Sequence, residues 1–159
     1  MVVKKRKPST VRPARPGTKR GAFEDQTVGD VLSTRVQAAR LDTKGDDLAA
    51  LLAKGPGPVM IVDKSKHLLG VVSEQDLLLS LDEGQQWSAL SAKEIMSENP
   101  YSVPPETNLS TFVHVLTESD LIAVPVVNAE NRLVGIVTRR DVVRAVLRRG
   151  AGRQARARA

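Results

Sequence analysis

The stretch GIVTRRD occupies residues 135–141, and a stretch of the same pattern, GVVSEQD, occupies residues 70–76. Each consists of a glycine, two β-branched aliphatic residues, a hydroxyl residue, two polar residues and an aspartate. The aliphatic pair is typical of a short buried strand, and a hydroxyl residue followed three positions later by an acid is typical of a helix start. The 159-residue chain therefore contains the same strand-to-helix transition twice.

The duplication extends to both sides of these stretches. The segment TVGDVLS (27–33) corresponds to SAKEIMS (91–97), and VMIVD (59–63) corresponds to VPVVN (124–128). A helical pattern precedes each of the two apolar segments VMIVD and VPVVN. Each unit is thus predicted to have the order β-α-β-β-α. Because one unit of about 60 residues would be only marginally stable, we expect the two units to share a core.

Composition excludes several kinds of site. The chain has no cysteine and two histidines, so disulfides, thiol catalysis and cysteine-based zinc sites are excluded and a histidine-rich metal site is not expected. We find no pairing of nucleophile and base, no metal-ligand cluster and no Walker loop, and therefore expect neither an enzyme nor a metal site. No apolar run approaches the roughly 20 residues that span a bilayer. We expect a cytoplasmic protein without a membrane span.

Charge divides the chain into an acidic middle and two basic ends. Residues 1–20 contain eight Lys or Arg residues and residues 148–159 contain five Arg residues, and neither segment contains an acid. Both ends are expected to be disordered, although the alanines and arginines of the C-terminal one could extend the preceding helix by a turn or two. The predicted organisation is a basic arm (1–25), a first repeat (26–84), a linker (85–90), a second repeat (91–148) and a basic tail (149–159).

The paired motifs resemble tandem CBS domains, which together form a Bateman module, and the resemblance covers about residues 26–148. It implies an α/β (α+β) fold in which the two repeats pack about a pseudo-two-fold axis, with disordered basic termini outside it. It also implies clefts for an adenosine-containing ligand such as AMP, ADP, ATP or S-adenosylmethionine, and a homodimer of disc shape. Such modules usually sense a ligand and regulate a partner protein, whose identity the sequence does not indicate.

The resemblance places the ligand-binding residues of the second repeat around Thr138 and Asp141. The aspartate would accept hydrogen bonds from a ribose, and Thr138 would donate to a ribose or phosphate oxygen. The guanidinium groups that follow Thr138 suit phosphates. The preceding segment and strand would form the rest of the pocket. The remaining candidates of this repeat are Arg139, Arg140, Val124, Pro125, Ser97 and Tyr101.

The first repeat offers Ser73 and Asp76 at the matching positions, but it departs from the pattern. Met60 stands in place of the proline, and Glu74 stands where the second repeat has an arginine, so a phosphate would be repelled. The cleft of the second repeat is therefore the preferred ligand site. For both aspartates, helix capping without any ligand remains the alternative.

The basic ends suggest a second function. They could attach the protein to nucleic acid, an anionic membrane or an acidic protein surface, without sequence specificity because no base-reading motif accompanies them. In this alternative the protein is a non-enzymatic dimerisation or scaffold protein whose basic arms bind nucleic acid or another polyanion. We also expect His114, within the apolar run TFVHVL, to be a partly buried structural residue.

Overall fold

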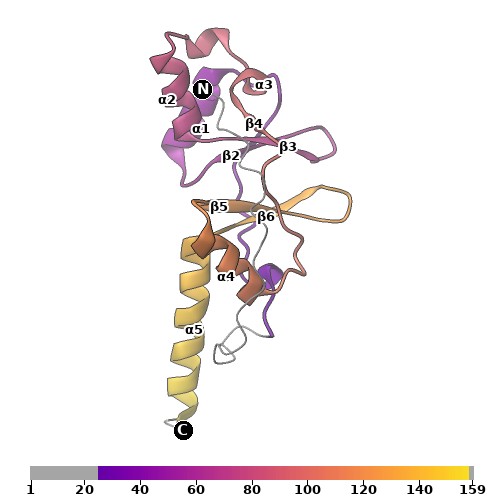
Figure 1. Ribbon diagram of the computed structural model, residues 1–159, viewed down its shortest axis with the longest axis vertical. Helices are drawn as coiled ribbons and strands as arrows, with labels where there is room; N and C mark the ends of the chain where they lie inside the picture. Colours follow the sequence, from indigo (N-terminus) through magenta and orange to yellow (C-terminus); the bar gives the residue numbers. More distant parts are fainter. Residues whose placement is uncertain (1–24, 158–159) are drawn as a thin grey trace.

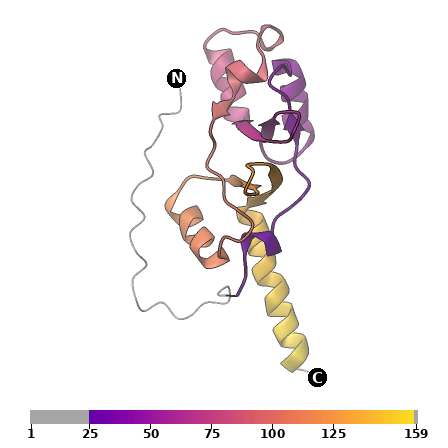
Figure 2. The ribbon, with the colours of Figure 1, turned by 90° about the vertical axis from the view of Figure 1, so that its right-hand side faces the viewer.

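The computed structural model describes the backbone of residues 25–157 and the side chains of residues 25–150, and residues 1–24, most of the predicted basic arm, lie outside it. Two α/β bodies are stacked along the long axis of the molecule, one formed mainly by the first repeat and one mainly by the second (Figure 1). The helix α5 extends from the second body away from the first (Figures 1 and 2). Within the described residues, no helix combines the length and apolarity that a bilayer crossing requires.

The first body contains a four-stranded sheet in the order β1-β2-β3-β4. Strand β1 runs parallel to β2, and β2, β3 and β4 are antiparallel neighbours. The strands are β1 (Ala38–Ala39), β2 (Val59–Val62), β3 (Leu68–Val72) and β4 (Ser97–Glu98). The accompanying helices are α1 (Gly45–Lys54), α2 (Glu74–Asp82), the 3-10 turn η2 (Trp87–Ala89) and α3 (Ala92–Ile95).

The second body contains the antiparallel pair β5 (Ala123–Val127) and β6 (Leu133–Thr138). Val103 forms an isolated parallel bridge to Val126, at the position that β1 occupies beside β2 in the first body. The helices of this body are η1 (Val28–Asp30), α4 (Leu109–Glu118) and α5 (Arg139–Ala157). The possibility that the C-terminal residues extend the last helix is thus realised up to Ala157.

The two hairpins confirm the repeat. In the first, Val59 is paired with Val72 and Ile61 with Gly70, and the register shifts between Ile61 and Val62. In the second, Val124 is paired with Val137 and Val126 with Gly135, and the register shifts between Val126 and Val127. The same residues therefore face one another in both repeats, including the β-bulge.

The segment that begins each repeat packs on the other repeat. Val28, at the start of the first repeat, is fully buried in the core formed by Phe112, Leu116 and other residues of the second repeat. Ala92, at the start of the second repeat, is fully buried against Leu48 and other residues of the first. Each repeat thus completes its partner's core, which explains why a single unit would not be stable alone.

The turns of the two hairpins meet each other across an approximate two-fold axis. The backbone N–H of Leu68 donates to the carbonyl of Asn131 at 3.0 Å, and the N–H of Leu133 donates to the carbonyl of Lys66 at 2.9 Å. The two hydrogen bonds are equivalent, because Leu68 corresponds to Leu133 and Lys66 corresponds to Asn131 in the two repeats. Beneath them lies a small apolar cluster shared by both hairpins, consisting of Met60, Leu68, Val127 and Ile136.

The prediction for His114 was wrong. Its neighbours Phe112 and Leu116 point into the core of the second body, and His114 itself lies exposed on the outer side of α4. The helix places residues two positions apart on different faces, and the apolar letters around His114 concealed this.

Candidate functional site

The start of α5 is held by a reciprocal hydrogen-bond pattern between Thr138 and Asp141. The backbone N–H and the hydroxyl of Thr138 donate to Asp141 Oδ2 at 2.8 and 2.7 Å, and the N–H of Asp141 donates back to Thr138 Oγ1 at 3.2 Å. This is the capping box that a hydroxyl residue and an acid three positions apart form at a helix start. Both residues are half-buried.

The start of α2 has the same arrangement. The N–H and the hydroxyl of Ser73 donate to Asp76 Oδ2 at 2.7 and 2.9 Å, and the N–H of Asp76 lies 3.4 Å from Ser73 Oγ. Capping therefore accounts for one carboxylate oxygen of each aspartate. The other oxygen, Oδ1, accepts no hydrogen bond from any described residue in either repeat.

Because a hydroxyl group has one proton, the capping box limits what Thr138 can do. That proton is already donated to Asp141, so it is not available for a phosphate. In this geometry Thr138 orients the aspartate and leaves Oδ1 as the acceptor that a ligand could reach.

The strand register brings Tyr101 and Val124 to the same edge. The parallel bridge between Val103 and Val126 places residue 101 level with residue 124. Val124 is paired with Val137, and the next pair of the ladder, Ala123 and Thr138, ends at the start of α5. Val124 and Pro125 are buried, whereas Tyr101 is 49% exposed, so its ring is accessible beside a buried aliphatic floor.

The two arginines after Thr138 differ in their surroundings. Arg139 Nη2 donates to the carbonyls of Ser119 at 2.8 Å and Leu116 at 3.4 Å, so its guanidinium covers the C-terminal end of α4. Cations at that end of a helix are stabilised by its unpaired carbonyls and its dipole. Arg140 is exposed and makes no such contact with any described residue. Only Arg140 is therefore free to meet a phosphate without breaking existing contacts.

Ser97 lies beside the first repeat and not beside Thr138. It belongs to β4, where it is paired with Val71 of β3. The matching residue of the first repeat is Ser33, whose bridge to Ile136 sets it next to β6 of the second repeat. The signal for this residue was present in the sequence, because Ser33 and Ser97 end the matching segments TVGDVLS and SAKEIMS. What the sequence did not reveal is that these segments are exchanged.

Gln37 is a second residue that sequence reasoning missed. Its carbonyl accepts the N–H of Met60, so it stands beside β2 where Tyr101 stands beside β5. The side chain is packed on Gly55, and its Nε2 is buried without a hydrogen-bond partner. The first repeat thus has a folded-back amide where the second has an exposed ring, which adds to the difference made by Met60 and Glu74.

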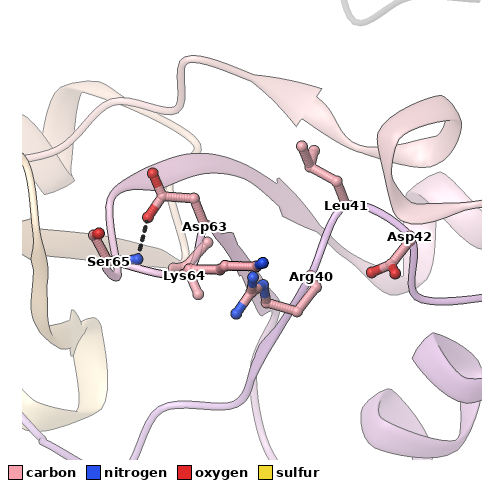
Figure 3. Close-up of a pocket in the computed structure, with 7 residues that line it drawn as sticks. Arg40, Leu41, Asp42, Asp63, Lys64 and Ser65 are labelled. Atoms are coloured by element: carbon pink, nitrogen blue, oxygen red, sulfur yellow. Dashed lines mark hydrogen bonds between the residues drawn. The ribbon is translucent and has the colours of Figure 1, made fainter.

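Two surface hollows lie outside the two pairs of capping residues. The first, of about 430 Å³, is formed by the chain after β1 and the β2–β3 turn, where Asp63 accepts a hydrogen bond from the N–H of Ser65 at 2.8 Å (Figure 3). It lies at the turn end of the hairpin, opposite the end that leads to Ser73. The second, of about 360 Å³, lies between α4 and α5 and includes Arg139. Neither hollow includes Thr138 or Asp141. The candidate site is therefore defined by the hydrogen bonds of these residues and by the strand register beside them.

The same turn contains the one histidine–carboxylate contact among the described residues. Asp63 Oδ2 lies 2.8 Å from His67 Nδ1, and Asp63 Oδ1 accepts the N–H of His67. These hydrogen bonds from His67 lower the pKa of Asp63. Among the described residues, no group of three or more His, Asp or Glu side chains is arranged to hold a metal ion.

Comparison with known proteins supports the reading of the fold. Residues 28–83 and 92–148 each match the CBS domain family. The chloroplastic CBS domain-containing protein CBSX2 of Arabidopsis thaliana is 30% identical over 151 residues, covering 76% of this chain and 63% of that protein. The chain thus spans less than two thirds of the length of this relative.

Solved structures agree. The crystal structure of CBSX2 in complex with AMP has a TM-score of 0.68 and 32% identity, covering 77% of this chain and 97% of that one. The CBS domain pair of MJ0100 in complex with 5'-methylthioadenosine and S-adenosyl-L-methionine has a TM-score of 0.67 and 25% identity, covering 76% and 95%. The cytosolic domain of the Mg²⁺ channel MgtE in complex with ATP has a TM-score of 0.65 and 25% identity, covering 77% and 50%.

The family match covers both copies of the duplicated stretch, and the structure gives both copies the same register, the same bulge and the same helix start. The chain belongs to the CBS domain family, and its two repeats form a tandem CBS pair, or Bateman module.

Proposed function

We propose that this protein is a regulatory, non-enzymatic module that binds an adenine nucleotide in the cleft of the second repeat and transmits its occupancy to a partner protein. The observation that carries the proposal is the helix start at Asp141, where one carboxylate oxygen is fixed by Thr138 and the other has no partner. The adenosine ligands of the similar structures are consistent with it.

The chemistry follows from the positions of the groups. Ribose hydroxyls would donate to Asp141 Oδ1, and adenine would lie on the exposed ring of Tyr101 at the edge of β5, beside the backbone of the fully buried Val124. The phosphates would meet Arg140 and the first backbone N–H groups of α5, which have no partner within the helix. Arg139 would keep its place on α4. This assignment retains Pro125 as part of the floor and removes Ser97 from this cleft.

Occupancy of the first repeat is proposed to be weaker. Glu74 adds a negative charge at the start of α2, and the side chain of Gln37 occupies the place of the accessible ring. A nucleotide with several phosphates should therefore prefer the second repeat, giving one strong site per chain.

Isothermal titration calorimetry on the full chain tests the site. AMP, ADP, ATP and S-adenosylmethionine are titrated into the wild type, Asp141→Asn and the matched variant Asp76→Asn. Hydrogen bonds to a charged group contribute about 1.5–3 kcal/mol, so Asp141→Asn should weaken the preferred ligand by about 10- to 100-fold. Asp76→Asn should change the affinity of that strong site by less than about threefold, a ratio worth under 0.7 kcal/mol.

The asparagine variant keeps an oxygen that can accept the N–H of Thr138, so the capping box can persist without its charge. We expect a small loss of stability, because an acid in the first turn contributes about 0.3–1 kcal/mol through the helix dipole. Thermal unfolding of the same samples separates the two roles. Equal nucleotide affinity in the wild type and Asp141→Asn would show that the aspartate only caps the helix.

We further propose that two copies of the chain associate through α2 and α5. Both helices expose aliphatic residues at matching positions, Leu78 and Leu81 on α2 and Val143 and Val146 on α5. A second copy can cover both patches at once, because the two repeats are related by the approximate two-fold axis. Light scattering should give a dimer for the wild type and a monomer for Leu78→Glu combined with Val143→Glu. Ile122→Glu, at a position 74% exposed outside these helices, is the control and should remain dimeric.

A further inference from the structure

Only the N-terminal part of α5 packs on the body of the protein. The helix runs from Arg139 to Ala157, about 28 Å at 1.5 Å per residue. Its first turns pack on the second repeat, where Val142 and Ala145 are buried. Its last turns extend beyond the body (Figures 1 and 2).

The residue type on the packing face changes where the helix leaves the body. Steps of three or four residues from Val142 and Ala145 lead to positions 149, 153 and 156, and all three are arginine. Arginine at these positions cannot continue an aliphatic contact. The sequence therefore ends the packing face after Ala145 and continues it as a basic one.

A second line of arginines lies on the neighbouring face. Arg140, Arg144 and Arg148 are four residues apart, about 6 Å along the axis, and all three are exposed. None of them forms an ion pair with a described acid, and no acid follows Asp141 in the sequence. Like charges four residues apart destabilise a helix by about 0.2–0.5 kcal/mol per pair, and Gly150 lies within the same helix. An anionic partner would relieve this repulsion.

We propose that the C-terminal half of α5 is a binding surface for duplex nucleic acid, and that it grips the phosphate backbone without reading the bases. Every basic residue after Lys93 is an arginine, whose planar guanidinium donates two hydrogen bonds to a phosphate. Residues 148–159 contain no aromatic side chain that could stack on unpaired bases. A repeating backbone of phosphates matches a row of arginines spaced along one helix, of which Arg144 and Arg148 are exposed.

The composition of this segment argues against the two other anionic partners. A helix that lies on a membrane needs Leu, Phe or Trp on its other face, and residues 148–159 offer only alanine as an apolar side chain. A protein partner would need a buried apolar or aromatic anchor at the centre of the interface, which the segment also lacks. Phosphate binding requires neither.

The test is fluorescence anisotropy of a labelled mixed-sequence 24-base-pair DNA duplex with the full chain, in 50–200 mM KCl. The variant is Arg144→Gln, Arg148→Gln and Arg153→Gln combined, because glutamine removes the charge and keeps a good helix propensity. Removing three phosphate contacts should flatten the slope of log K against log salt by about 2.7 and weaken binding in 100 mM KCl on the order of 100-fold. Arg140 is left in place because we assign it to the nucleotide cleft.

The control removes the same charge from the first body, by Lys54→Gln, Lys64→Gln and Lys93→Gln at exposed positions. It should keep the slope within about one unit of the wild type, the change expected for one phosphate contact. The α5 variant should retain its nucleotide affinity, so failure of this proposal is separate from failure of the nucleotide site.

Three outcomes would overturn the assignment. The wild type could fail to bind the duplex in 50 mM KCl. The α5 variant could bind as tightly as the wild type, which would transfer the binding to another basic segment. The wild type could also prefer vesicles containing phosphatidylserine, or poly-glutamate, to the duplex at equal charge concentration.

Discussion

The glycine that begins the duplicated stretch can be tested by adding one methyl group. A Cβ placed on Gly135 would lie 2.6 Å from the carbonyl oxygen of Ser33 and 2.7 Å from Leu32 Cδ1. The Ser33 carbonyl cannot move freely, because the backbones of Ser33 and Ile136 exchange hydrogen bonds of 2.8 and 2.9 Å. The first repeat has the same arrangement, since a Cβ on Gly70 would lie 2.9 Å from the carbonyl oxygen of Ser97.

The magnitude follows from the competing effects. Overpacking a well-filled site costs about 1–3 kcal/mol, and loosening the two backbone hydrogen bonds costs about 1 kcal/mol each. Alanine also restricts the unfolded chain, which stabilises the protein by about 0.4–1 kcal/mol. The clash is larger, so Gly135→Ala should lower the free energy of unfolding by about 2–4 kcal/mol. For a body of this size, the melting temperature should fall by roughly 10 °C.

Urea unfolding followed by circular dichroism measures this change, and Gly150→Ala is the control. A Cβ at Gly150 meets nothing within 4 Å, and the residue lies within α5, so alanine there should stabilise the protein or leave it unchanged. Of the two identical substitutions, only the one at Gly135 should thus destabilise the protein. If Gly135→Ala changed the free energy of unfolding by less than about 0.5 kcal/mol, a typical surface effect, the exchange of the leading segments would be refuted.

Three further predictions concern the two cores and a helix cap. Trp87→Phe removes the indole hydrogen bond of 3.2 Å to the carbonyl of Leu77, and urea unfolding should show a loss of about 1–2 kcal/mol. Phe112→Ala empties the fully buried centre of the second core, and the same assay should show a loss of about 3–5 kcal/mol. Hydrogen bonds from the backbone and hydroxyl of Ser91 lower the pKa of Glu94, so its contribution is present above the ordinary carboxyl range and is lost as the pH falls through the lowered value. Between pH 6 and pH 3, the melting temperature should therefore fall less steeply for Glu94→Gln than for the wild type. An unchanged pH dependence would contradict that role, and a loss below 0.5 kcal/mol in either core variant would contradict the packing.

Local chemistry made the helix starts predictable. A hydroxyl residue and an acid three positions apart can satisfy each other's polar groups only at a helix start, so Thr27 with Asp30 and Ser91 with Glu94 could be assigned without coordinates. The structure shows the side-chain contact in both, at 3.2 and 2.9 Å. The spacing of the matching apolar segments likewise fixed which strands pair, because both hairpins use the same residues.

The surroundings of the candidate site residues could not be predicted from the sequence, because the direction of a side chain depends on what packs nearby. Arg139 and Arg140 are equivalent in the sequence, yet Arg139 covers the end of α4 because that helix ends within its reach. Gln37 gave no signal by itself, since its role follows only from its place beside β2. Thr138 was expected to donate to a ligand, whereas in the folded chain its hydroxyl donates to Asp141.

The sequence alone determined that the chain contains two equivalent strand-to-helix units and where their strands and caps lie. These features depend on residues a few positions apart, whose interactions are the same wherever the unit stands. Only the tertiary structure decided that each repeat takes its first segment from the other, so that Ser33 borders β6 and Ser97 borders β3. If each repeat kept its own first segment, the same residue types would be buried in the same pattern. The two arrangements differ only in which long-range contacts the connecting chain allows. The sequence pattern is identical for both, and the packing of Val28 and Ala92 distinguishes them.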